Sequence, residues 1–260
     1  MELALLLNSM GDRDEAQKLF EEVIEGQTAL FNALHTDTLT TKGDLAGLLY
    51  DNNIGDMDTP KRLMEEVIEG HTAQLGTSHT STLTTKGNLA MLLEDMDDKD
   101  GAKRLYDEVI EGETAQLGAS HLNTLSTKGN MAGLLKRTGE MASAKRLYKE
   151  VVEGRTAQLG ASHTDTLTTK NNLALLLEDM DEMDESRRLR EEIIEGMTAQ
   201  LGASHTDTLT TKNNLACFLR NTGEVDKACR LFEEVIEGRK RSSAHLKLTR
   251  SRARDRWGGC

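Results

Sequence analysis

Apolar residues recur along this chain at spacings of three, four and seven residues, the spacings of an amphipathic helix. Between residues 81 and 112 the pattern occurs twice, and a short polar stretch separates the two runs. It therefore predicts a helix, a turn and a second helix. The first stripe consists of Leu83, Leu89, Ala90 and Leu93, and the second of Ala102, Leu105, Tyr106, Val109 and Ile110.

This helix pair is one unit of a repeat. Residues 163–204 read HTDTLTTKNNLALLLEDMDEMDESRRLREEIIEGMTAQLGAS, and close variants of this string fill most of the chain. Marker residues return every 42 residues, with one interval of 44, as the histidines at 35, 79, 121, 163 and 205 show. A period of this length predicts a stacked array, in which each unit buries its apolar face against its neighbours.

Polar residues and glycines predict where the helices begin and end. The two residues added in the longer interval lie within 52–58, inside a predicted turn. The first helix of each pair should be N-capped by a short side chain that accepts from free N–H groups: Asp37, Ser81, Asn123, Asp165 and Asp207. The turn within each pair should contain a residue in the left-handed conformation: Gly11, Gly55, Asp97, Gly139, Asp181 and Gly223.

The composition agrees with helices, because aromatic residues make up only 3% of the chain and proline occurs once. Charge is unevenly distributed. Residues 239–260 hold eight Lys or Arg and one Asp, a charge of +7. Since the net charge of the whole chain is −12, the first 238 residues carry a charge of −12 − 7 = −19. An acidic body disfavours non-specific binding to nucleic acid. Three cysteines without CxxC spacing predict a reducing, cytoplasmic location.

The strings HTDTLTTKNNLALLL, DKACRLFEEVIEG and TAQLGASH resemble the 42-residue tetratricopeptide repeats of kinesin light chains and of nephrocystin-type proteins. The resemblance covers residues 2–240 and implies an all-α, right-handed α-α superhelical solenoid of helix-turn-helix repeats. We therefore expect residues 1–240 to form six repeats, the first incomplete, and residues 241–260 to form a basic, disordered tail. Small residues occupy the close helix contacts, although Ser186 and Thr59 interrupt the second alanine column.

Two columns break the local pattern. Lysines 42, 86, 128, 170 and 212 lie on the apolar stripe of the first helix. We expect each to lay its methylenes on the core edge and to meet a Glu of the adjacent helix, and a ladder that grips an acidic ligand is the alternative. Glycines 26, 70, 112, 154, 196 and 238 lie in the middle of the second helix. There glycine is unfavourable by about 0.5–1 kcal/mol, so it indicates a close helix crossing.

No residue pattern points to catalysis, and we predict no enzymatic activity, no metal and no cofactor. The His–Thr–Asp–Thr string occurs in several units, whereas an active site is normally built once. Successive histidines of the column would stand about 10 Å apart, one helix diameter. A metal bond needs about 2 Å, so they cannot share one ion.

By resemblance, ligands of such an array bind its concave face, which the first helices line. Asparagine suits an extended peptide because its amide both donates and accepts hydrogen bonds, although a solvated polar face is the alternative. Charge alternates along this wall from one repeat to the next. The predicted peptide-binding residues are Asn88, Asn130, Asn171, Asn172, Asn213, Asn214, Glu94, Lys136, Arg137, Glu178 and Arg220.

The sequence thus predicts a protein-interaction scaffold whose partner is a protein or peptide. Nucleic acid is expected only through the basic tail, and no segment is expected to span a membrane. The last unit should expose Leu231, Val235 and Ile236, which makes end-to-end self-association an expectation. Two alternatives are the sensor segment of a larger signalling protein and a fragment of a longer array resembling a cargo adaptor.

Overall fold

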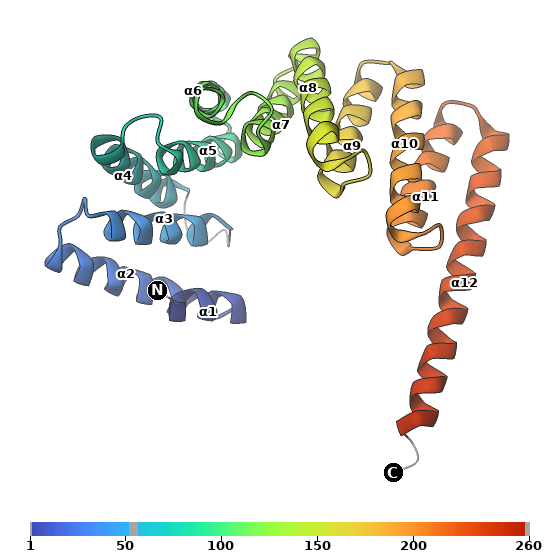
Figure 1. Ribbon diagram of the computed structural model, residues 1–260, viewed down its shortest axis with the longest axis horizontal. Helices are drawn as coiled ribbons and strands as arrows, with labels where there is room; N and C mark the ends of the chain where they lie inside the picture. Colours follow the sequence, from blue (N-terminus) through green and yellow to red (C-terminus); the bar gives the residue numbers. More distant parts are fainter. Residues whose placement is uncertain (1, 52–56, 258–260) are drawn as a thin grey trace. The chain divides into compact units, whose positions relative to one another are not determined.

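The structure is a computed structural model that describes residues 2–51 and 57–257. These residues form twelve α-helices and no strand (Figure 1). The helices are α1 Glu2–Met10, α2 Arg13–Leu30, α3 Thr36–Asp51, α4 Asp58–Leu75, α5 Thr80–Asp95, α6 Lys99–Leu117, α7 Leu122–Arg137, α8 Met141–Leu159, α9 Thr164–Asp179, α10 Met183–Leu201, α11 Thr206–Asn221 and α12 Val225–Trp257.

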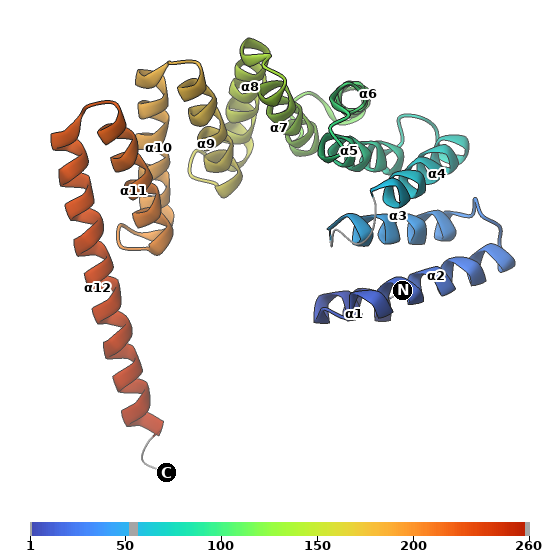
Figure 2. The same ribbon diagram turned by 180° about the vertical axis from the view of Figure 1, so that it is seen from behind.

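The chain divides into two compact units, Met1–Gly139 and Glu140–Cys260. In the first unit each helix from α1 to α6 packs against the helix that follows it, and in the second unit each helix from α8 to α11 does the same. Figure 2 shows this succession from the opposite side. Packing of consecutive helices without a common central core confirms the predicted all-α solenoid.

The core of each unit consists of the predicted small and apolar columns. The alanines of the first helices are fully buried: Ala46, Ala90, Ala132, Ala174 and Ala216. The alanine column of the second helices is buried as well, and Ser186 takes its place in α10 with no exposed surface. In α4 the buried residue of this column is Pro60. Thr59, which was expected in the column, is exposed. Small side chains at these positions allow the helices to approach closely.

The predicted N-caps are wrong by two residues. The cap is the histidine before α5, α7, α9 and α11, and its Nδ1 accepts a hydrogen bond from the backbone N–H of the residue predicted to be the cap. His163, for example, accepts from the N–H of Asp165 at 3.2 Å. Because the imidazole of the histidine already accepts from a free N–H of the first turn, the helix begins at the next residue. The short polar residue predicted to be the cap therefore lies inside the helix.

The predicted left-handed turns are confirmed where the structure describes them. Gly11, Gly139 and Gly223 have φ angles of 92°, 84° and 87°, and Asp97 and Asp181 adopt 62° and 61°. Gly55 and residues 52–56 of the predicted insertion lie outside the described residues. The sequence pattern did not predict a second set of residues with positive φ, which lies at the ends of the second helices. Its members are Asn32, Gly76, Gly118, Gly160 and Gly202.

Four of the six mid-helix glycines mark close helix crossings, as predicted. A Cβ added at Gly70 would lie 2.6 Å from a methyl carbon of Leu39, and the same clash occurs at three further positions: Gly112 with Leu83, Gly196 with Leu167 and Gly238 with Leu209. Gly26 differs, because a Cβ there would meet nothing within 4 Å.

The lysine column forms ion pairs within the helix pair, as predicted. Lys42 contacts Glu66, Lys86 contacts Glu108, Lys170 contacts Glu192 and Lys212 contacts Glu234, at 2.6–2.7 Å. Lys128 donates to the backbone carbonyl of Ala119 at 3.3 Å. Burial alone would raise the pKa of Glu66, but Lys42 and Arg62 lower it below its usual value. These lysines are therefore part of the packing and do not form a free positive ladder.

The end of the chain differs from its prediction. α12 continues through residue 240 to Trp257, where a disordered tail was expected. No glycine or proline interrupts the sequence between Gly238 and Gly258, and its Leu, Ala, Lys and Arg favour helix. The division of the chain at residue 240 stays a prediction. Of the three apolar residues expected to be exposed, only Ile236 is, since Leu231 is half-buried and Val235 is buried.

Candidate functional site

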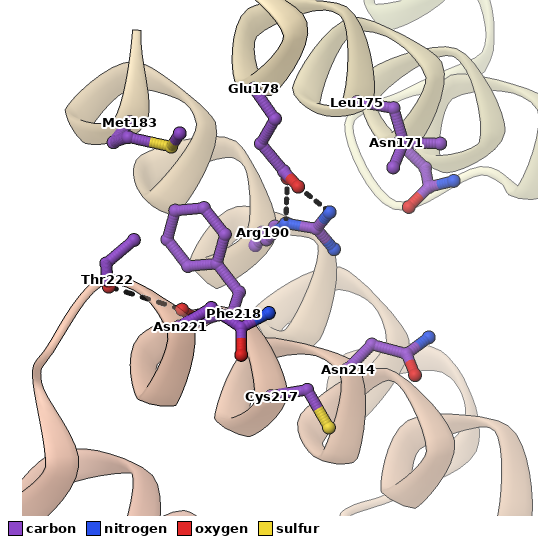
Figure 3. Close-up of a pocket in the computed structure, with 10 residues that line it drawn as sticks. All are labelled: Asn171, Leu175, Glu178, Met183, Arg190, Asn214, Cys217, Phe218, Asn221 and Thr222. Carbon is purple, nitrogen blue, oxygen red and sulfur yellow. Dashed lines mark hydrogen bonds and ion pairs between the residues drawn. The ribbon is translucent and has the colours of Figure 1, made fainter. Parts of the chain in front are cut away.

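Two adjoining cavities, of about 490 and 460 Å³, lie within the second unit. Both are lined by α9, α10 and α11, and they share Asn171, Arg190 and Asn214. We call them together the α9–α11 groove. Figure 3 shows residues that line the first cavity, among them Asn171 and Asn214, with the ring of Phe218 between Met183 and Arg190.

The groove combines amides with apolar walls. Asn171 and Asn214 are exposed, so their amides are accessible to a ligand. Apolar side chains of all three helices line the rest: Leu167, Leu175, Met183, Ile193, Met197, Leu201, Cys217 and Phe218. Apolar walls with a few convergent polar groups are typical of ligand-binding clefts.

The structure brings three of the predicted peptide-binding residues into the groove, namely Asn171, Glu178 and Asn214. Asn172, Asn213 and Arg220 lie on the same helices but do not line either cavity. The remaining predicted residues belong to the first unit: Asn88, Glu94, Asn130, Lys136 and Arg137. Whether these residues bind a peptide stays a prediction.

Glu178 is held by neighbouring side chains. Its Oε1 accepts from Arg190 Nε at 2.8 Å and from Arg190 Nη2 (Figure 3). The same oxygen accepts from Ser186 Oγ at 2.8 Å. The guanidinium carbon of Arg190 lies 5.4 Å from the ring centroid of Phe218, a cation–π contact. Only 8% of Arg190 is exposed. Glu178 therefore stabilises the wall of the groove, and whether it also contacts a ligand stays a prediction.

The side chains around Glu178 depart from their own repeat columns, a signal that sequence reasoning missed. Arg190 stands where the other repeats have Phe20, Met64, Tyr106, Tyr148 and Phe232. Phe218 replaces a leucine and Ser186 replaces an alanine or proline. Columns that are otherwise apolar change together at one place, and comparing each residue with its column would have found them.

The first unit also ties up several predicted residues. Arg137 of α7 forms an ion pair with Glu94 of α5, whose side chain is 11% exposed. Asn130 approaches the sulfur of Met91 at 3.8 Å. Tyr50 donates to Asp95 at 2.5 Å, and burial together with this bond raises the pKa of Tyr50 to about 12. These contacts join successive first helices and leave fewer free polar groups than the sequence suggested.

Within residues 2–51 and 57–257, no group of three or more His, Cys, Asp or Glu side chains is placed to hold a metal ion. No helix in that part of the chain is long and apolar enough to cross a membrane. Cys217 and Cys229 are free thiols.

Comparison with protein families decides the classification. The tetratricopeptide-repeat model matches residues 81–157 and 165–241, and a second model of the same description matches residues 1–37. The chain belongs to the tetratricopeptide-repeat family. The family indicates a general role as a protein-interaction scaffold. A search of curated proteins found no match.

Solved tetratricopeptide-repeat structures share the fold at low identity. A Podosopora anserina protein assigned as a kinesin light chain has nearly identical tetratricopeptide-like repeats. Their structure superposes with a TM-score of 0.70 at 21% identity, over 80% of this chain and 98% of that one. BtubC (BKLC) from P. vanneervenii gives 0.72 at 17% identity, over 89% and 92%. A repeat protein from Cytophaga hutchinsonii gives 0.61 at 13% identity, over 95% and 81%. The predicted tetratricopeptide-repeat fold is confirmed.

Proposed function

We propose that this chain is a non-enzymatic scaffold that binds an extended peptide segment of a partner protein in the α9–α11 groove. The observation that carries the proposal is that the two cavities share three lining residues, Asn171, Arg190 and Asn214. An extended segment presents backbone N–H and C=O groups along its length, and two exposed amides on successive first helices, α9 and α11, can bond to both kinds.

The groove favours a modest affinity. Aromatic anchors usually supply much of the binding energy in peptide complexes, but Phe218 is buried against Arg190 and Tyr50 lies in the other unit. Specificity would come from side chains of the ligand that fit beside Leu175, Met197 and Leu201. We expect micromolar or weaker affinity for a single short peptide, and a nanomolar complex would contradict this expectation.

A peptide-display screen against the full chain tests the proposal. Enriched peptides should lose about tenfold in affinity when Asn171→Ala and Asn214→Ala are combined, since two hydrogen-bonding amides are removed. The comparison variant combines Asn88→Ala and Asn130→Ala, which are also exposed asparagines of first helices but lie in the first unit. Loss in this variant alone, or no loss in the groove variant, would exclude the groove as the binding surface.

A further inference from the structure

Two exposed apolar faces lie on the first and last helices of the described chain. Leu3 and Leu6 of α1 are 58% and 55% exposed, and Val225 and Ile236 of α12 are 53% and 52% exposed. Single exposed apolar residues are ordinary on protein surfaces. Here the repeat itself shows what each of the two faces contacts elsewhere in the chain.

The face on α1 is buried in every other repeat. Leu3 and Leu6 occupy columns whose other members are at most 7% exposed: Leu45, Leu89, Met131, Leu173 and Leu215 for the first, and Leu48, Leu92, Leu134, Leu176 and Phe218 for the second. In α11 the corresponding residues, Leu215 and Phe218, form one apolar cluster with Leu219 and Ala228. α1 thus carries the surface that a first helix normally buries.

The face on α12 is the other half of the same contact. Met183 and Ile194 of α10 pack against the cluster that contains Leu215 and Phe218. Val225 and Ile236 stand 42 residues after them, in the same columns. α12 therefore repeats the surface with which α10 holds the next first helix, and nothing in the described part of the chain covers it.

We propose that a second copy of this chain covers these faces, with α1 of one copy packed on α12 of another as α11 packs on α10. Leu3 and Leu6 would take the places of Leu215 and Phe218, against Val225 and Ile236. The two surfaces differ, so the contact is heterologous. Each added copy leaves one free face of each kind, and assembly continues past the dimer unless a ring closes.

Successive repeats within the chain are joined by an ion pair that the proposed contact between two copies lacks. Lys145 of α8 pairs with Glu182 at 2.5 Å, and Arg187 of α10 pairs with Glu224 at 2.8 Å, in each case joining a second helix to the turn of the next repeat. The corresponding residues of the proposed junction are Cys229 on α12 and Asp12 of the next copy. A thiol cannot replace the cation, so the junction should be weaker than those within the chain.

Sedimentation of the full chain under reducing conditions, over a range of concentrations, tests the proposal. Leu6→Asp and Ile236→Asp should each weaken association about tenfold or more, because a charge enters an apolar contact. The control is Leu34→Asp, which changes a side chain of similar exposure, 52%, in the turn before α3. Wild-type chain that stays monomeric throughout, or equal loss in the control, would overturn the proposal.

Mixing the two face variants separates a head-to-tail contact from a symmetric one. The Leu6→Asp chain keeps its α12 face and the Ile236→Asp chain keeps its α1 face, so the mixture should form dimers that grow no further. A mixture that remains monomeric, or either variant forming dimers alone as readily as wild type, contradicts the head-to-tail arrangement.

A second variant should strengthen the junction. Cys229→Lys supplies the cation that α8 and α10 provide, and association should rise about two- to fivefold at low salt, the effect of an exposed ion pair. The gain should disappear when Asp12→Asn is added to the same chain. A gain that survives this change, or no gain at all, would show that α12 does not meet the turn after α1.

Discussion

At the scale of single residues, the histidine column has a structural role that its spacing did not reveal. The imidazole Nδ1 accepts from the second N–H of the helix that follows, at 3.2–3.3 Å in all five places. The repetition of the column therefore reflects helix capping, and the metal or catalytic roles considered for it are not needed to explain it.

Removing one cap should destabilise the chain more than changing the residue predicted to be the cap. His121→Ala should lower the free energy of unfolding by about 0.5–2 kcal/mol. Asn123→Ala should have a smaller effect, because Asn123 contributes its backbone N–H to the cap and alanine retains that group. Urea denaturation of both variants checks the order, and a reversed order would restore Asn123 as the cap.

His71 should make stability depend on pH. Its burial, reinforced by the charge of His79, lowers its pKa below the ordinary value, and its buried Nδ1 has no hydrogen-bond partner. Below about pH 6.5 the unfolded chain binds a proton at this residue, while the folded chain does not until a lower pH. The folded state therefore binds fewer protons, and stability falls as pH falls through this window.

The matched variant is His71→Gln, since Gln27 occupies the same column. Between about pH 7.5 and pH 5.5 the urea midpoint of the wild type should decrease more than that of the variant, because only the wild type titrates at residue 71. Parallel curves for the two chains would show that this residue does not contribute.

Arg190 should support both the stability and the groove. Arg190→Ala removes the bonds to Glu178 and the contact with Phe218, and should destabilise the chain by about 1–3 kcal/mol. The control is Arg188→Ala on the exposed side of the same helix, for which we expect less than about 0.5 kcal/mol. Thermal or urea unfolding measures both, and similar losses would contradict a special role of Arg190.

At the scale of helices, glycine has two different environments in one column. Gly70→Ala would place a methyl group against Leu39, which is fully buried, whereas Gly26→Ala would place it in open space. Gly26→Ala should stabilise the chain by about 0.5–1 kcal/mol through helix propensity alone. Gly70→Ala should be destabilising by about 1–2 kcal/mol, because overpacking exceeds that gain. Denaturation of the pair isolates the crossing, and equal effects would contradict it.

At the scale of the whole molecule, stability should vary along the array, since each helix depends on its neighbours. α1 is nine residues long and packs mainly against α2. Its amides should exchange with solvent fastest in dilute solution, and those of α9 should be among the slowest. Hydrogen exchange by mass spectrometry checks this order. Protection of α1 that rises with protein concentration would further agree with head-to-tail contact.

The sequence by itself determined the repeat architecture. The 42-residue period, the apolar stripes and the small-residue columns specify helix pairs that pack on their neighbours. These contacts are local, so periodicity carries most of their information. The lysine–glutamate pairs and the glycine crossings were predictable for the same reason, because both recur in several repeats within one helix pair.

Only the tertiary structure decided which individual residues are available to a ligand. Glu178 and Arg137 looked free along the sequence, yet side chains of other helices hold them. The cavity shared by Asn171 and Asn214 likewise depends on how α9, α10 and α11 meet. Such contacts join residues from different helices and occur once, so no periodic pattern records them. Repetition determines the fold, and departures from repetition determine the candidate site.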